Sequence, residues 1–304
     1  MRSERTTPYL KLLFAVFAWG GSFIATKTAV VQISPNTLIW MRFAIGLVII
    51  GLIVKQRNEF KIIPKKDLVQ FAILGFIGIT FHQYLQSTGL LTSDASTTAW
   101  IVALTPIFIA ILGWLVLKEK LKWFAIFGII FAAIGVILVV TKGNISQISS
   151  AASYTEGDFL ILLSAINWAV FSILARRLLK KYESSLALFY IMGFGWFFTS
   201  ISFIYNKGFL ELTNLDQNGW TSVLFLGIGA TGLAYIAWFD GLKVVPAAVA
   251  GSFIYLEPLF AAFLASIFLD ERITKSSILG GLLILFGVWI VTYRKKDIIK
   301  TPIN

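Results

Sequence analysis

Seven polar side chains able to carry charge or form several hydrogen bonds fall inside long apolar segments of this sequence: Lys27, Arg42, His82, Gln83, Gln86, Asn167 and Glu257. Such groups are costly away from water unless they meet a partner, so they are candidates for binding a polar ligand. An arginine such as Arg42 can hold a carboxylate through two N–H groups, whereas Lys27 offers one point charge. Gln83 and Gln86 are three residues apart and share a helix face. A carboxylate at Glu257 could take up and release a proton.

Structural roles remain open for the same residues. The long side chains of Lys27 and Arg42 can reach toward the membrane surface, His82 can be a neutral histidine held by hydrogen bonds, and Glu257 can be fixed in an ion pair with Arg42.

The chain has no cysteine and one histidine, which excludes thiolate catalysis and a histidine-pair metal site. The absence of clustered carboxylates adds to this, so the sequence predicts neither an enzyme nor a cofactor or metal ion.

Aromatic residues and two prolines extend the candidate set. Deep aromatic positions could line an amphipathic pocket or pack against neighbouring helices; they are Trp19, Tyr84, Trp100, Trp168, Tyr235, Trp238 and Tyr255. We take five of them as candidate site residues: Trp19, Trp100, Trp168, Tyr235 and Tyr255. Pro106 and Pro258 each remove a helix hydrogen bond near the predicted bilayer centre, which frees the carbonyls of Val102 and Ile254. Each proline is therefore a candidate hinge, with a static bend as the alternative.

The elements that must hold these residues are predicted membrane spans. The 304 residues are 58% hydrophobic and 13% charged, with a mean hydropathy of +0.83, which is too apolar for a water-soluble fold. Stretches long enough to cross about 30 Å of hydrocarbon at about 1.5 Å per residue lie at 10–31, 36–54, 68–90, 95–117, 122–141, 158–179, 185–206, 220–241, 247–269 and 276–294. The first stretch is too long for the apolar core of a signal peptide, so we expect it to be retained.

The charge distribution predicts the orientation of these spans. The 26 Lys and Arg against 15 Asp and Glu give a net charge of +11, which in a soluble protein would suggest a nucleic-acid partner. Here the charges gather in short loops. With the N-terminus in the cytoplasm, 20 basic residues fall inside and four outside. This bias predicts ten spans in the inner or plasma membrane, both termini cytoplasmic, and no nucleic-acid partner.

An internal repeat divides the chain. A shift of 152 residues aligns the third to fifth spans with the eighth to tenth, pairing among others Pro106 with Pro258, Glu119 with Glu271, and Gly135 with Gly287. The paired glutamates are interpreted as solvated turn ion pairs or as parts of a gate. A five-span unit has an odd number of spans, so its copy must be inverted. We therefore predict repeats at 1–142 and 158–304, the second with a basic cytoplasmic tail, joined by an extracytoplasmic loop at 143–157.

Three segments in this frame resemble the EamA-type carriers of the drug/metabolite transporter superfamily: the Phe-Ala-Trp-Gly-Gly-Ser-Phe run at 17–23, the Trp-Met-Arg-Phe run at 40–43, and the Tyr-Leu-Glu-Pro run at 255–258. The resemblance covers nearly the whole chain. It implies an all-α membrane protein with ten helices around a central cavity, often an exporter, and adds Ser22 to the candidate binding residues. One departure is that Thr105 stands where the second repeat has Glu257, so we expect an asymmetric site.

Together these observations predict a secondary transporter that exports small organic metabolites, such as amino acids or amphipathic drug-like compounds, by alternating access. Its expected partners are the lipid bilayer, a small-molecule substrate and, as one option, a coupling proton. Carriers of phosphorylated or nucleotide sugars remain an alternative, although these anions would require more cations than Lys27 and Arg42. A non-transporting membrane protein, either a lipid-modifying enzyme or a sensor, remains the alternative from another class.

Overall fold

The computed structural model describes residues 2–117, 123–144, 155–245 and 253–293. Within these ranges the regular elements are all helical. They are α1 (Arg2–Val30), α2 (Pro35–Gln56), α3 (Lys65–Gly75), η1 (Phe76–Phe81), α4 (His82–Gly89), α5 (Ala95–Val102), α6 (Thr105–Leu117), α7 (Trp123–Val140), α8 (Glu156–Lys181), α9 (Ser184–Tyr205), η3 (Gly208–Asn214), α10 (Gln217–Leu224), η4 (Phe225–Leu233), α11 (Ala234–Val244), α13 (Glu257–Phe268) and α14 (Lys275–Tyr293).

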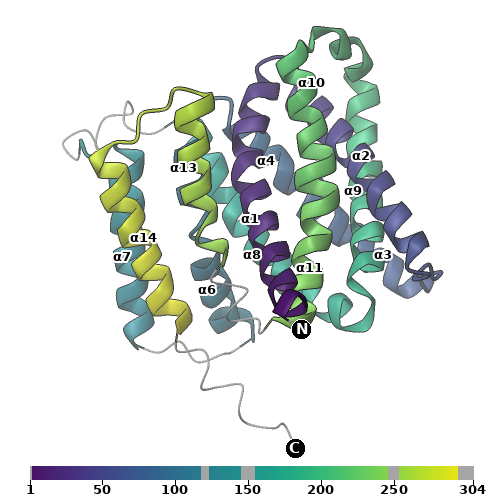
Figure 1. Ribbon diagram of the computed structural model, residues 1–304, viewed down its shortest axis with the longest axis horizontal. Coiled ribbons are helices and arrows are strands. Elements are labelled where there is room, and N and C mark those ends of the chain that lie inside the picture. The colour runs from purple at the N-terminus through teal and green to yellow at the C-terminus, as the bar shows by residue number, and fades with distance from the viewer. Residues whose placement is uncertain (1, 118–122, 145–154, 246–252, 294–304) are drawn as a thin grey trace, which may run out of the picture.

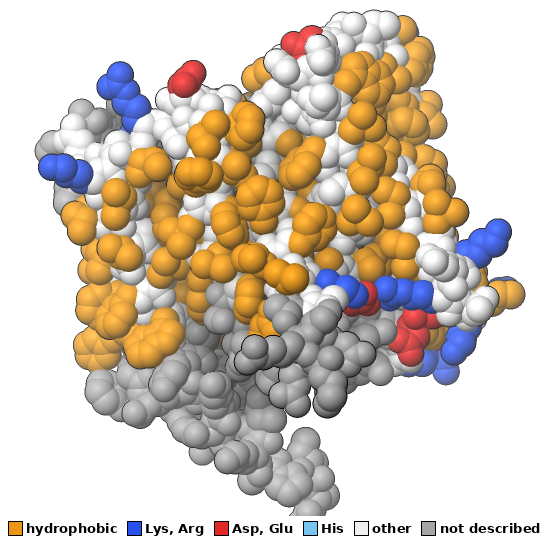
Figure 2. All heavy atoms as spheres, viewed as in Figure 1, with side chains coloured by type: hydrophobic (Ala, Val, Ile, Leu, Met, Phe, Trp, Pro, Cys, Tyr) orange, Lys and Arg blue, Asp and Glu red, His pale blue; other side chains and the backbone are white. Residues whose placement is uncertain are grey.

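Seven helical segments of the described chain are long and apolar enough to cross a membrane: Thr7–Val30, Pro35–Gln56, Lys65–Gly89, Ala95–Val116, Glu156–Ala175, Ser184–Tyr205 and Gln217–Gly241. Three shorter apolar helices, Ile126–Val140, Glu257–Phe268 and Lys275–Ile290, lie within the three other predicted spans. Apolar side chains cover the middle of the face shown in Figure 2, with charged groups at its two ends. The chain is therefore an all-helical, multi-pass membrane protein, and the exact number of ten spans stays a prediction.

The helices form a main bundle with a two-helix layer at one side (Figure 1). In that layer α14 packs mainly against α7. The two backbones meet at glycines, because a Cβ atom placed on Gly135 would lie 2.5 Å from the carbonyl oxygen of Gly280. In the main bundle α1 contacts α11, α13 and η4, while α2 packs between α9 and η4. This arrangement surrounds α1, α2 and α4 with partners and places their polar residues inside the protein.

Four helix irregularities occur at positions that the 152-residue shift pairs. The third and eighth predicted spans each contain a π-helical segment, η1 and η4. The fourth and ninth are interrupted by turns at 103–104 and 255–256, immediately before α6 and α13. Side chains bind the carbonyls freed there: Asn167 donates to the Ile77 carbonyl at 2.8 Å and Thr105 to the Val102 carbonyl at 2.7 Å. π-segments and broken helices of this kind commonly build binding sites in membrane proteins.

Ion pairs mark the two ends of the bundle. At one end, which we call the Asp240 end, Asp240 accepts hydrogen bonds from Lys11 and Arg57, both at 2.9 Å. At the opposite end, the Glu271 end, Lys27 lies 3.6 Å from Asp94 and 3.8 Å from Glu271. The charge bias predicts that the Asp240 end faces the cytoplasm and that the Glu271 end faces outward.

Candidate functional site

A cavity of about 270 Å³ lies between the interrupted helices. Residues from α1, α2, α4, α5, α6, α8, α11 and α13 line it, so both halves of the chain contribute. Its walls contain Trp19, Ser22, Phe23, Arg42, His82, Gln83, Gln86, Val102, Thr105, Pro106, Ile109, Trp168, Ser172, Tyr235, Ile254 and Glu257. Nine of the thirteen predicted binding residues are therefore brought together here, and Pro106 lies beside them.

Arg42 supplies the cation of this cavity. Its helix, α2, is capped by Ser34, whose hydroxyl accepts a hydrogen bond from the Thr37 amide, and the arginine is only 4% exposed. The guanidinium donates from Nε to Thr231 at 2.7 Å and from Nη1 to Gln83 at 2.9 Å. It makes no ion pair within the described chain. A guanidinium has five N–H donors, so Arg42 is fixed by two of them and keeps others for a ligand.

Glu257 supplies the carboxylate. It is the first residue of α13, directly after the interruption at 255–256, and it is half-buried. Among the described residues its carboxylate has no hydrogen bond and no ion pair, so the pair with Arg42 weighed from the sequence is not formed in this conformation. The cavity therefore holds a cation and a carboxylate on different helices, each with capacity to bind further groups.

Amide, imidazole and hydroxyl groups from α4 and α11 complete the polar wall. The Nδ1 atom of His82 lies 3.2 Å from the Ser164 carbonyl oxygen; because a carbonyl only accepts, Nδ1 carries the proton and Nε2 is the acceptor in the neutral ring. This contact agrees with a neutral, hydrogen-bonded histidine. The Gln86 amide and the Tyr235 hydroxyl, both in buried residues, have no hydrogen-bond partner within the described ranges.

Aromatic rings close the cavity around these groups. The Trp168 ring lies 4.7 Å from the His82 ring, and the Trp19 ring meets that of Tyr235 edge-on at 5.4 Å, both measured between centroids. The Trp19 indole also donates to the Ala230 carbonyl in η4 at 3.2 Å. The aromatic residues thus pack against one another and also line the cavity, where a ligand can contact them.

Four predicted binding residues and one predicted hinge lie elsewhere. Lys27 reaches the Glu271 end, where it donates to the Ser93 carbonyl at 2.5 Å. Trp100 is buried against α14, and Tyr255 packs against the apolar cluster that contains Trp100. Asn167 supports η1 through its bond to the Ile77 carbonyl. Pro258 is buried in the first turn of α13.

Six cavity residues are not among the site residues predicted from the sequence. Thr105 had a usable signal, because it is the repeat partner of Glu257. Ser172 also had one, since it lies four residues after Trp168 and shares its helix face; its hydroxyl donates to the Trp168 carbonyl at 2.7 Å. Val102 and Ile254 had a signal in the carbonyls that Pro106 and Pro258 free. Phe23 and Ile109 are apolar and give no signal in a sequence this hydrophobic.

The Glu271 end carries a second polar cluster. Asp94 precedes α5 but makes no side-chain cap on it. Instead Glu271, from the segment after α13, accepts hydrogen bonds from the Ala95 amide at 2.8 Å, the Ser96 amide at 3.1 Å and the Ser96 hydroxyl at 2.6 Å. Glu271 is thus a helix cap rather than a solvated turn residue, with a side chain 13% exposed. Its repeat partner Glu119 lies outside the described residues.

The helical membrane bundle with a buried polar cavity defines a multi-pass membrane carrier. The sequence profile of the EamA-like transporter family matches residues 6–141 and 155–293, and the chain belongs to this family. It is accordingly a transporter and not an enzyme.

Relatives of similar length support the same assignment. A protein named as an uncharacterized transporter of Archaeoglobus fulgidus is 24% identical over 94% of this chain and 98% of its own length. A protein named as the uncharacterized transporter YyaM of Bacillus subtilis is 28% identical over 92% of each chain. A protein of known crystal structure superimposes with a TM-score of 0.65 over 97% of this chain and 99% of its own, at 17% identity, which shows the likeness of fold.

Proposed function

We propose that this chain is a secondary exporter of small organic metabolites, amino acids or amphipathic drug-like compounds, that binds its cargo in the central cavity. One observation carries the proposal. Buried Gln86 and Tyr235, together with half-buried Glu257, have no hydrogen-bond partner among the described residues, and Arg42 keeps free N–H groups beside them. These residues line the cavity, where polar groups without a protein partner are satisfied by water or by a ligand, so they are suited to a small ligand that bears both donors and acceptors.

The size and charge of the cavity favour small cargo. Its volume of about 270 Å³ lies just below the range of about 300–1,000 Å³ that is usual for small-molecule pockets. Arg42 is the only Lys or Arg among its described lining residues. One guanidinium matches one carboxylate, whereas a sugar phosphate or a nucleotide sugar would call for additional cations. Phosphorylated cargo therefore ranks second.

Alternating access is the mechanism we propose, with two inverted five-helix repeats exchanging conformations around the cavity. Support comes from the paired π-segments and paired interruptions described above, because they break the regular α-helical hydrogen bonding at matched positions of both halves. Pro106 and Pro258 are the second residues of α6 and α13, just after the interruptions, and are proposed as the hinges. We further propose that Glu257 couples proton entry to cargo exit, and that the protein lies in the cell membrane with both termini in the cytoplasm, as the charge bias predicts.

The test is flux in proteoliposomes, screened with a panel of amino acids and amphipathic compounds after a thermal-shift search for stabilising ligands. Ser172→Trp places a large ring in the cavity and should abolish flux and ligand stabilisation together. Thr221→Trp, on an exposed position of α10, is the matched control and should retain both. Flux that survives Ser172→Trp in a folded protein would place the transport path elsewhere, and no flux for any compound would favour a sensor.

A further inference from the structure

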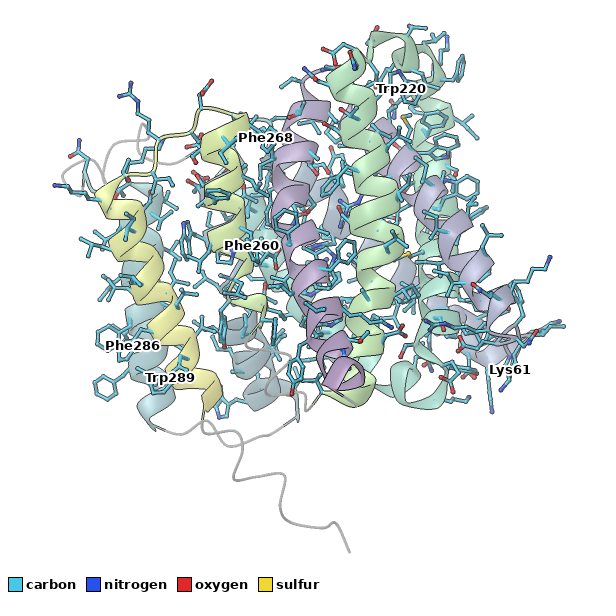
Figure 3. All side chains as sticks on the ribbon, viewed as in Figure 1. Lys61, Trp220, Phe260, Phe268, Phe286 and Trp289 are labelled. Carbon is cyan, nitrogen blue, oxygen red and sulfur yellow. The ribbon has the colours of Figure 1, made fainter. Side chains whose placement is uncertain are left out.

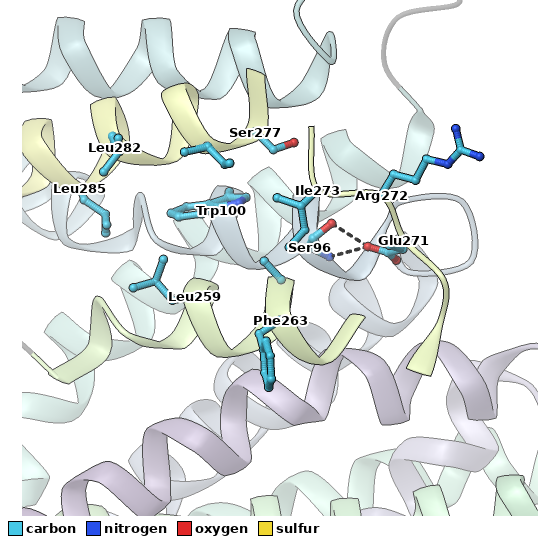
Figure 4. Close-up of a pocket in the computed structure, with 12 residues that line it drawn as sticks. Ser96, Trp100, Leu259, Phe263, Glu271, Arg272, Ile273, Ser277, Leu282 and Leu285 are labelled. Carbon is cyan, nitrogen blue, oxygen red and sulfur yellow. Dashed lines mark hydrogen bonds between the residues drawn. The ribbon is translucent and has the colours of Figure 1, made fainter. Parts of the chain in front are cut away.

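A second cavity of about 260 Å³ lies between α13 and α14 (Figure 4) and shares no lining residue with the central cavity. Leu259 and Phe263 form its wall on α13, while Leu282 and Leu285 form its wall on α14. The indole of Trp100 lies between the two walls. We call this cavity the α13/α14 groove.

The groove exists because α14 packs on α7 instead of on its chain neighbour α13, which packs against α1 and α5. Trp100 holds the two helices apart. Its indole lies so close to α14 that a Cβ atom on Gly281 would be 2.4 Å from the ring. The groove is therefore built into the packing of α5, α13 and α14, and no other described segment fills it.

The groove faces the membrane rather than water. Phe263 is 58% exposed and Leu282 is 59% exposed, and both lie on helices that we place in the hydrocarbon layer. Further along α14, Phe286 and Trp289, both labelled in Figure 3, are each 47% exposed, with ring centroids 6.0 Å apart. Lipid chains are the only abundant apolar molecules at such a surface, and a recess there is filled by them.

The mouth of the groove at the Glu271 end is polar and contains one carboxylate and one guanidinium. Ser96, Glu271, Arg272 and Ser277 line it, but the carboxylate of Glu271 is already engaged by the backbone and hydroxyl of α5. Arg272 is exposed and has no ion pair or hydrogen bond within the described chain. Lys275 is the first residue of α14. Its charge and the free amide groups of the helix N-terminus therefore lie at the same end of the groove as Arg272.

A neighbouring groove provides an internal comparison. It has a volume of about 250 Å³, lies between α7 and α8, and is similarly apolar, with Val136, Ile137 and Phe159 in its walls. Its polar end holds Thr141 and Asp158, and no Lys or Arg is among its described lining residues. The two grooves thus offer lipid chains similar space, but only the α13/α14 groove has a guanidinium among its described lining residues.

We propose that the α13/α14 groove is a binding site for one phospholipid of the leaflet at the Glu271 end, with an acyl chain along Trp100 and Leu282 and the phosphate at Arg272. The apolar walls suit an acyl chain, and a guanidinium at the mouth can bind two phosphate oxygens. The proposal concerns a lipid outside the central cavity, so it does not depend on the transported cargo.

Native mass spectrometry of the full chain in detergent tests the proposal, with phosphatidylglycerol and diacylglycerol of the same chain length as the two probes. The parent should retain one phosphatidylglycerol and bind diacylglycerol about fivefold more weakly, the effect expected for one phosphate–cation contact at a membrane surface. Arg272→Gln should lower phosphatidylglycerol occupancy by a similar factor, whereas Arg272→Lys should retain most of it. Leu282→Trp should abolish the adduct.

Ile137→Trp is the matched control, because Ile137 is a lipid-facing residue of the comparison groove and its replacement should leave the adduct intact. In vesicles of phosphatidylglycerol with brominated chains, quenching of indole fluorescence should diminish in Trp100→Phe. Equal adducts in the parent and Leu282→Trp, equal losses in Leu282→Trp and Ile137→Trp, or equal binding of the two probes would each overturn the proposal. Unchanged binding in Arg272→Gln would overturn it as well, and this variant alters only an exposed side chain.

Discussion

Glu271 connects the two halves of the chain at a single helix end, and its replacement by glutamine tests whether this contact closes the carrier. The carboxylate accepts three hydrogen bonds from the start of α5 at 2.6–3.1 Å, and the Lys27 ammonium lies 3.8 Å away. Both oxygens are used. Glu271→Gln keeps the side-chain length but replaces one acceptor oxygen by an NH₂ group that faces N–H donors.

The expected loss follows from these contacts. Hydrogen bonds to a charged group contribute about 1.5–3 kcal/mol against about 0.5–1.5 for neutral ones, and an N-cap contributes about 1 kcal/mol. The ion pair with Lys27 adds little, because it is long and Lys27 is partly exposed. We expect a loss of about 1–2 kcal/mol in the conformation closed at the Glu271 end. If the contact breaks on opening, the open conformation gains a factor of about 5–30 in population.

Cysteine labelling measures this population directly. The natural chain has no cysteine, so Ser22→Cys provides one reporter in the central cavity, and an impermeant thiol reagent is applied from the side of the Glu271 end. Glu271→Gln should raise the labelling rate by about the factor above. Asp270→Asn is the control, since Asp270 is exposed with φ 53°, a conformation that asparagine also adopts. A labelling rate unchanged by Glu271→Gln, or raised equally by Asp270→Asn, would refute the gate.

Three further outcomes are expected. Arg42→Ala should weaken cargo binding more than folding, and Arg42→Lys should restore part of it, because only guanidinium binds a carboxylate through two donors; isothermal titration of the folded variants measures this. A cysteine at Ser149, outside the described residues, should react only from the extracytoplasmic side. The Gly219 amide and the Gln32 side chain hold the pKa of Asp216 below its usual value, so Asp216→Ala should lower the melting temperature at pH 6, and the difference should shrink below about pH 4.

Much of the cavity could be predicted because polar residues in apolar spans are rare and informative. Arg42, His82, Gln83, Gln86 and Glu257 were selected on that criterion alone, and the structure brings all five into one cavity. The cost of burying such groups restricts them to positions where they meet a partner or a ligand. The helix interruptions could likewise be anticipated from proline, which cannot donate a helix hydrogen bond.

The same criterion cannot say which partner a buried polar group meets. Asn167 donates to the Ile77 carbonyl in η1, and Lys27 donates to the Ser93 carbonyl at the Glu271 end. Which neighbour each side chain meets depends on how its helix is rotated, and a uniformly apolar sequence does not encode that rotation. Trp100 shows the same limit for aromatic residues. Its position against Gly281 follows from the pairing of α14 with α7, a long-range choice that no local pattern predicts.

Glu257 provides the sharpest test of the coupling mechanism. It lies at the start of α13 with no cation partner in the described chain, and an ionised carboxylate in such a site is stabilised only by cargo, water or a shift of Arg42. Binding a proton from one side and releasing it to the other would therefore accompany the exchange of conformations.

Glu257→Gln keeps shape and hydrogen bonding but removes the exchangeable proton, so it should lose transport driven by a pH gradient while retaining cargo binding and cargo exchange. Gln86→Glu, which adds a carboxylate at another lining position on α4, should not restore the lost coupling if the position beside the α13 interruption is essential. Gradient-driven flux equal to the parent in folded Glu257→Gln would exclude Glu257 as the proton carrier and would make His82, whose Nε2 is an acceptor in the neutral ring, the next residue to replace.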